Sequence, residues 1–214
     1  MAEKDTHCSP WRSIWIEPRK TIRSIVRTDA KLYFWLLSWI YAFPILLHMA
    51  QNFSLGEVYS MVLIVALAVV AAPFVGWVFL SLFAVMLLWT GRWIGGQSNY
   101  MGLRAAVSWS NVPNTINIVL WALLAIQFGS VLFTQGFMQM DLEGSQLTLV
   151  AVIFLVQAVL AVWTLVILLN TVAEVQKFSV WKAVLNVVMP FVIVFIASWV
   201  LAWMVWSIHV FIQS

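Results

Sequence analysis

The sequence predicts an all-α, polytopic integral membrane protein with five transmembrane helices, a cytosolic N-terminus and an external C-terminus. The first observation behind this prediction is composition. The chain has 214 residues, of which 64% are hydrophobic and only 9% charged, whereas soluble domains carry roughly 25% charged residues. The second observation is that every Lys and Arg falls on one side of the membrane if five hydrophobic stretches are read as spans. Short loops rich in these residues stay cytoplasmic.

The positions of the basic residues also select the number of spans. Seven precede the first apolar stretch, two bracket the second gap and two lie in the fourth gap. They are Lys4, Arg12, Arg19, Lys20, Arg23, Arg27, Lys31, Arg92, Arg104, Lys177 and Lys182. Topologies with four or six spans would place some of them on the outer face, so the charge pattern favours five.

Residues 1–31 are predicted to form a basic, amphipathic arm in the cytosol. Pro10, after Ser9, and Pro18 are typical of helix starts, and the second helical piece carries isoleucines on one side and cations on the other. This pattern is typical of a helix lying in a membrane interface. We predict that the arm binds anionic lipid, with a docking role for partner proteins as the alternative. The predicted lipid-binding residues are Trp11, Arg12, Trp15, Arg19, Lys20, Arg23 and Arg27.

The remaining residues, 32–214, are predicted to form the membrane domain, with spans at about 32–50, 58–90, 105–128, 147–169 and 183–210. The second stretch would make a helix about 50 Å long, although about 20 residues suffice to cross the hydrocarbon core. A split near Pro73 would place Arg92 and Arg104 outside. We therefore expect one long helix, tilted or kinked at Pro73 and Gly76, with Ala68, Ala72 and Gly76 forming a close-packing face.

No Asp, Glu, Lys or Arg lies inside the predicted spans. Charges within membranes usually mark ion pathways or proton relays, so an ion-coupled pump and a carboxylate-based intramembrane enzyme are disfavoured. The single cysteine, Cys8, permits neither an intramolecular disulfide nor a cysteine metal cage. Of the three histidines, His48 and His209 fall near the outer ends of spans, and two ligands without nearby carboxylates are too few for a metal site. We predict no catalytic residues, no metal and no cofactor. A nucleic-acid partner is not expected, because the basic residues lie beside membrane spans.

The most distinctive apolar stretch is residues 110–117, which hold three asparagines spaced by three residues around a proline. Such amides form hydrogen bonds between helices worth roughly 0.6 to 2 kcal/mol each, and they can satisfy the carbonyl that a proline frees. The alternative is a polar track for a lipid headgroup or a small solute. The residues of this intramembrane polar track are Asn111, Pro113, Asn114 and Asn117.

Three segments, in this order and spacing, resemble bacterial members of the Yip family. They are residues 15–23 (WIEPRKTIR) followed by Asp29, the Gly95-Gly96 pair with the Ala-rich segment that ends in Pro113, and residues 174–183 (EVQKFSVWKA). The resemblance covers nearly the whole chain. It implies a five-span helical fold with a cytosolic N-terminus and, for the compact bacterial form, a location in the inner membrane.

Eukaryotic members of this family interact with Rab/Ypt GTPases and act in vesicle traffic and membrane shaping. This chain has a very short N-terminal arm, and residues 28–33 (TDAKLY) stand in place of the family's Asp-Leu-Tyr-Gly-Pro type motif. The GTPase partner is therefore not carried over from the resemblance.

The leading hypothesis is a non-enzymatic multi-pass membrane protein that organises lipids or partner proteins at the cytosolic membrane face. Its expected partners are anionic lipids, and a membrane-protein partner or a second copy of the chain. The alternative is a transporter or lipid-translocating protein that uses the Asn111–Asn117 track.

Overall fold

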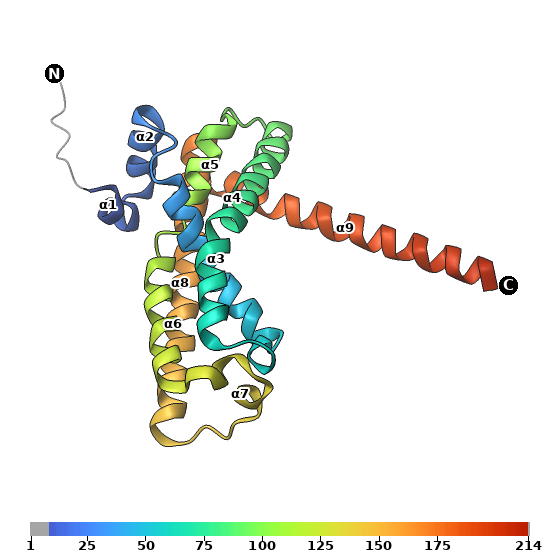
Figure 1. Cartoon of the computed structure of the whole chain (residues 1–214). Helices are drawn as coiled ribbons and strands as arrows, with labels where there is room; N and C mark the ends of the chain where they lie inside the picture. Colours follow the sequence, from blue (N-terminus) through green and yellow to red (C-terminus); the bar gives the residue numbers. More distant parts are fainter. Residues whose placement is uncertain (1–8, 214) are drawn as a thin grey trace.

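The structure, a computed structural model, describes residues 9–213, and within that range the chain forms helices joined by turns and contains no strand. Figure 1 shows their arrangement. The elements in order are α1 (Pro10–Ile16), α2 (Pro18–Thr28), α3 (Phe34–Asn52), η1 (Leu55–Glu57), α4 (Met61–Trp93), α5 (Tyr100–Trp109), α6 (Asn114–Phe128), η2 (Gly129–Phe133), α7 (Gln135–Gln139), α8 (Gly144–Gln176) and α9 (Val180–Gln213). Lys4 and Cys8 lie outside the described residues.

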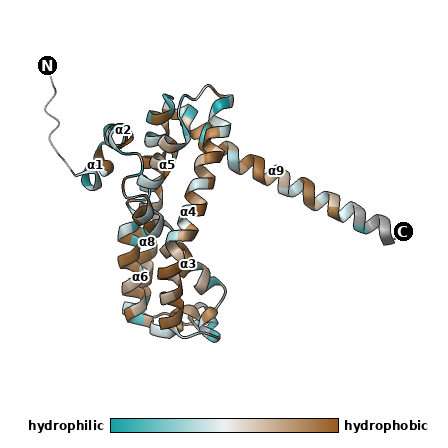
Figure 2. Cartoon of the chain, turned by 45° about the horizontal axis from the view of Figure 1, so that its top comes forward, coloured by the Kyte–Doolittle hydropathy of each residue, from teal (hydrophilic) through white to brown (hydrophobic). Residues whose placement is uncertain are grey.

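Five of these helices are long and apolar enough to cross a membrane, which confirms the predicted fold class. They cover 34–52, 61–93, 114–133, 144–176 and 180–207, with mean hydropathy from 1.3 to 2.8. Figure 2 shows hydrophobic residues along the lengths of α3, α4, α6 and α8, with hydrophilic residues gathered toward their ends. This distribution is the one that a bilayer requires of a helix bundle.

The second apolar stretch is a single helix, as expected from the position of Arg92. α4 has 33 residues with Pro73 inside it, and it packs along α3. Ala68, Ala72 and Gly76 line its buried face, with Ala72 0% exposed. A Cβ atom at Gly76 would lie 2.0 Å from the backbone oxygen of Ser38 on α3. The two backbones therefore approach at a distance that only glycine permits.

The third span differs from the expected 105–128, because this stretch is two helices, α5 and α6, separated by a turn at residues 110–113. The turn is closed by short-range backbone bonds, such as Asn114 N to Asn111 O at 3.0 Å. Pro113 has no amide hydrogen with which to continue α5. The apolar composition of both halves hides this break in the sequence.

α9 joins the bundle only through its first part. Ala183 and Asn186 are 0% exposed and Val187 is 6% exposed, where the helix packs on α4 and α8. Beyond Pro190 the side chains are mostly exposed, among them Phe195 at 70%, and Figure 1 shows the helix leaving the bundle to one side. A membrane helix that is apolar on all faces is stable when lipid surrounds it.

The bundle has two chemically different ends. At one end meet α1, α2, α5, the start of α3 and of α9, and the final turns of α4 and α8, and this end carries every Lys and Arg of residues 9–213. At the other end Gln51 Nε2 donates to the carbonyl of Leu132 at 3.2 Å, and Glu57 accepts from the amide of Gln135 at 3.0 Å. We refer to the first as the basic end. Its orientation toward the cytosol stays a prediction.

The close approach of α3 and α4 predicts the effect of Gly76→Ala. The added methyl group meets a backbone carbonyl that cannot rotate away, and overpacking of this kind costs about 1–3 kcal/mol. We expect a lower thermal unfolding midpoint in detergent, measured by scanning fluorimetry. Ala66→Val, on the exposed face of the same helix, is the control and should leave the midpoint unchanged. A Gly76→Ala midpoint equal to the wild-type value would contradict the packing described.

The expected orientation can be tested with reporters fused at the two ends of the membrane domain. A phosphatase that is active only outside the cytosol should be active after Ser214 and inactive when it is inserted after Lys31. This follows because the basic residues hold their end of the bundle in the cytosol. Activity after Lys31 would invert the predicted topology.

Candidate functional site at the basic end

The arm is folded onto the membrane helices. Ile22 and Ile25 of α2 are 0% and 2% exposed and belong to the same core cluster as Leu103 of α5 and Val172 of α8. The apolar face that the sequence analysis assigns to the membrane interface is thus covered by protein. Apolar burial alone does not explain this choice, because lipid tails accommodate an isoleucine as well as a protein surface does.

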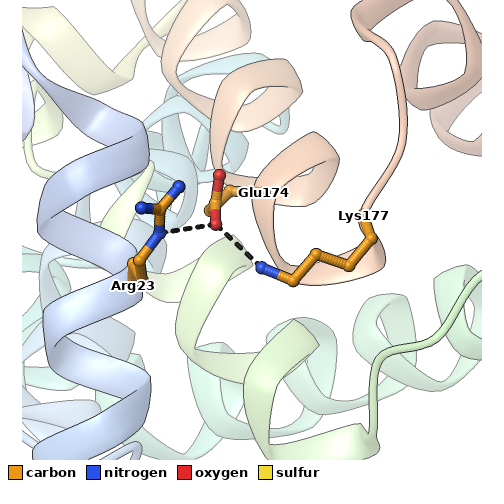
Figure 3. Close-up of polar contacts among 3 residues, drawn as sticks. All are labelled: Arg23, Glu174 and Lys177. Carbon is orange, nitrogen blue, oxygen red and sulfur yellow. Dashed lines mark hydrogen bonds and ion pairs between the residues drawn. The ribbon is translucent and has the colours of Figure 1, made fainter.

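An ion pair holds α2 against α8. Arg23 Nε donates to Glu174 Oε1 of α8 at 2.8 Å, and Lys177 Nζ reaches the same oxygen at 2.9 Å (Figure 3). The Glu174 side chain is 9% exposed, against 49% for Arg23. The hydrogen bond with Glu174 raises the pKa of Arg23, so the guanidinium stays charged. A carboxylate so deeply placed needs its cations, and one of them comes from the arm.

A second polar contact lies one helical turn away on both helices. Arg19 Nε donates to Asn170 Oδ1 at 3.0 Å, and Asn170 Nδ2 donates to the carbonyl of Val166 at 2.8 Å. Residues four apart on a helix share a face, so Arg19 and Arg23 both face α8. Together the two contacts fix the register of α2 along α8.

An aromatic cluster fixes α1. The ring of Trp11 lies 5.3 Å from that of Trp109 at the end of α5 and 5.8 Å from that of Tyr33. Trp109 is 1% exposed, and Ile14, one turn along α1, is 0% exposed. Tilted ring pairs at these distances add about 0.5–1.5 kcal/mol each beyond the area that they bury. Both helices of the arm are therefore part of the folded domain.

The last turn of α8 also holds the loop between α4 and α5. The Gln176 side chain is 1% exposed, its Nε2 donates to the carbonyl of Leu87 at 3.3 Å and its Oε1 accepts from the amide of Ser98 at 3.2 Å. A Cβ atom at Gly96 would lie 2.3 Å from this oxygen, and Gly95 has a φ of +88°. Gly95 thus permits the backbone turn of the loop, and Gly96 leaves room for the Gln176 side chain.

The seven predicted lipid-binding residues fall into three groups. Arg12, Lys20 and Arg27 are exposed, and Lys20 pairs at 2.9 Å with Glu17 on the surface. Arg19 and Arg23 bond to α8. Trp11 and Trp15 pack against the core. The binding of lipid by these residues remains a prediction, but the structure brings all of them to one end of the bundle.

The predicted polar track is engaged in local hydrogen bonds. Asn111 Nδ2 donates to the carbonyl of Val107 in the last turn of α5 at 2.7 Å, and Asn114 Nδ2 donates to Asn111 Oδ1 at 3.3 Å. Asn117 Oδ1 accepts from Gln157 Nε2 of α8 at 2.9 Å. Pro113 is buried in the turn. These contacts are those of amides that close a turn and tie α6 to α8, and transport along the track stays an untested prediction.

Sequence reasoning missed Asn170 and Gln176 as contacts, and it assigned Glu174 to a loop. The signal was present in the residues but not in any local pattern: four polar side chains, at 170, 171, 174 and 176, follow the apolar run of residues 165–169. Within residues 9–213, no three His, Cys, Asp or Glu side chains gather as a metal site would require.

The fold defines the chain as a multi-pass integral membrane protein. The family model of the Yip1 domain matches residues 12–202, and the chain belongs to this family. The matched range begins inside α1, so it includes the arm along with the membrane helices. No curated protein and no solved structure matches the chain.

The match to the Yip1 domain confirms the family that the sequence resembled. The family consists of membrane proteins that are not known as enzymes and that interact with partners such as GTPases. The match does not bear out the bacterial branch, and the inner-membrane location stays a prediction.

The contact between Arg23 and Glu174 predicts that Glu174→Gln frees α2 from α8. The substitution removes the carboxylate charge that holds Arg23, and with it the reason for α2 to pack on protein and not on lipid. Spin labels at Ser24→Cys and Trp181→Cys, with Cys8→Ser, should give a narrow distance distribution in the parent protein and a broad one with Glu174→Gln.

The matched control is Glu17→Gln, which breaks only the surface pair with Lys20. Exposed pairs contribute about 0–1 kcal/mol, so the control distribution should stay narrow. A narrow distribution for Glu174→Gln would show that the arm stays docked without the Glu174 charge, through apolar packing and the Arg19–Asn170 hydrogen bond.

Proposed function

We propose that this protein organises anionic lipids at the face of the membrane where its basic end lies, with α1 and α2 presenting the charge. One observation carries the proposal: the arm has its apolar face on the bundle and leaves Arg12, Lys20 and Arg27 exposed. The role is non-enzymatic, in keeping with the family.

The docked arm acts differently from a free amphipathic helix. A free helix binds by inserting its apolar face into lipid, whereas here that face is occupied by α5 and α8. Attraction to headgroups then comes from charge alone, at about 1 kcal/mol for each basic residue near an anionic surface. It acts over about 10 Å at 0.1 M salt. Because the arm is fixed to the spans, the charges lie at a constant place relative to the bilayer.

The proposal is tested with the full chain in its membrane. Arg12→Gln with Arg27→Gln removes two exposed charges for which residues 9–213 show no side-chain hydrogen bond or ion pair, so folding should be retained. We expect the enrichment of phosphatidylglycerol around the protein to fall by up to about 30-fold, because two charges at about 1 kcal/mol each amount to about 2 kcal/mol. Copolymer discs cut from mixed phosphatidylglycerol and phosphatidylcholine bilayers, followed by lipid mass spectrometry, measure this enrichment.

The control pair is Arg92→Gln with Lys182→Gln, which removes the same charge from the same end but outside the arm. An equal fall in both double variants would show that only total charge matters, and the arm would lose its proposed role. Enrichment that does not respond to 0.5 M salt would count against the mechanism as well.

A further inference from the structure

A cleft of about 510 Å³ lies between the α1–α2 junction and α8, beside the contacts that dock α2. Its walls are the junction between α1 and α2, which supplies Trp15, Ile16, Arg19 and Lys20, and the outer face of α8, which supplies Trp163 and Val166. The volume lies in the range of small-molecule sites, about 300–1,000 Å³. The charge and apolar contacts described above do not fill this space.

The cleft has a polar end formed by Glu17, Arg19, Lys20 and Asn170. Asn170 engages only the Nε of Arg19, so the two terminal nitrogens of the guanidinium remain available while the group is held in place. Two parallel N–H donors match the oxygens of a phosphate. Lys20 adds a second cation, which Glu17 offsets in part at 2.9 Å, and the cleft keeps a net positive charge.

The other end of the cleft is apolar and open. Trp163 lies seven residues before Asn170 on α8, or about 10 Å toward the middle of the helix. Its side chain is 41% exposed, that of Val166 is 39% exposed and that of Ile16 is 84% exposed. The cleft therefore opens on the outer surface of the bundle, which in a membrane faces lipid. Its polarity changes from charged to apolar in the same direction as the bilayer changes from headgroup to hydrocarbon.

We propose that this cleft binds one anionic phospholipid, with the phosphate on Arg19 and Lys20 and the start of an acyl chain against Trp163 and Val166. The inference rests on the proposed function and adds a single defined site to it. A soluble phosphate would leave the apolar end empty, and a neutral hydrocarbon would leave the guanidinium without an acceptor. An anionic phospholipid satisfies both ends.

The test uses the full chain, purified in mild detergent, freed of lipid and titrated separately with phosphatidylglycerol and phosphatidylcholine of identical chains. Native mass spectrometry counts the bound lipid. We expect one phosphatidylglycerol for each chain, held roughly tenfold more tightly than phosphatidylcholine, because both lipids carry the phosphate but only choline adds a cation beside Arg19 and Lys20. Glycerol phosphate, the headgroup without chains, should compete poorly.

Two variants separate the ends of the site. Arg19→Gln should abolish the preference for phosphatidylglycerol, and Val166→Trp should weaken both lipids equally by filling the apolar end. Lys31→Gln removes an arm charge outside the cleft, and Val152→Trp adds a ring elsewhere on the exposed face of α8. Both controls should bind as the wild-type protein does.

An unchanged preference in Arg19→Gln, or an equal loss in Lys31→Gln, would overturn the site. Competition by glycerol phosphate equal to that of the whole lipid would overturn the lipid assignment in favour of a free phosphate. These results are distinguishable from failure of the proposed function, which is measured on Arg12 and Arg27, because neither residue lines the cleft.

Discussion

The docked position of the arm depends on the ion pair between Arg23 and Glu174, which a contact with lipid tails could not replace. Ile14, Ile22 and Ile25 could lie in a bilayer interface at little cost, so their burial does not distinguish protein from membrane. The side chain of Arg23 distinguishes the two surfaces. It pairs with Glu174, whose side chain is only 9% exposed and which is stabilised there by the guanidinium and by Lys177. The arm, the loop of residues 94–99 between α4 and α5, and the start of α9 all meet the last two turns of α8, so that segment sets the geometry of the basic end.

Long elements could be predicted from the sequence, because hydrophobicity and charge act locally. α4 follows from an apolar stretch that must end on the same side as Arg92, and Pro10 and Pro18 mark the starts of α1 and α2. The break between α5 and α6 could not be predicted from the sequence, because a proline such as Pro113 in an apolar run is equally compatible with a kinked helix and with a helix end. The extension of α8 to Gln176 was also hidden, because its support comes from Arg23, Leu87 and Ser98, which are far away in the chain.

The candidate site could also be predicted only in part from the sequence. The cations of the arm were visible as a cluster, but which of them are free was not, because Arg19 and Arg23 are distinguished only by Asn170 and Glu174 across the interface. The cleft arises where two such faces meet without filling the space between them. Trp163 and Val166 are unremarkable in an apolar span and line the cleft only because the arm docks beside them.

The contact between Arg23 and Glu174 joins residues 151 positions apart, which has a consequence for biosynthesis. At about 5–20 residues per second, the arm leaves the ribosome roughly 8 to 30 seconds before its acceptor on α8. During that time its isoleucines need a temporary surface, and the bilayer interface is the nearest one. Docking is then a late folding step, possible only after α8 has inserted with its C-terminal end on the same side as the arm. Docking of the arm therefore depends on the correct insertion of the intervening helices.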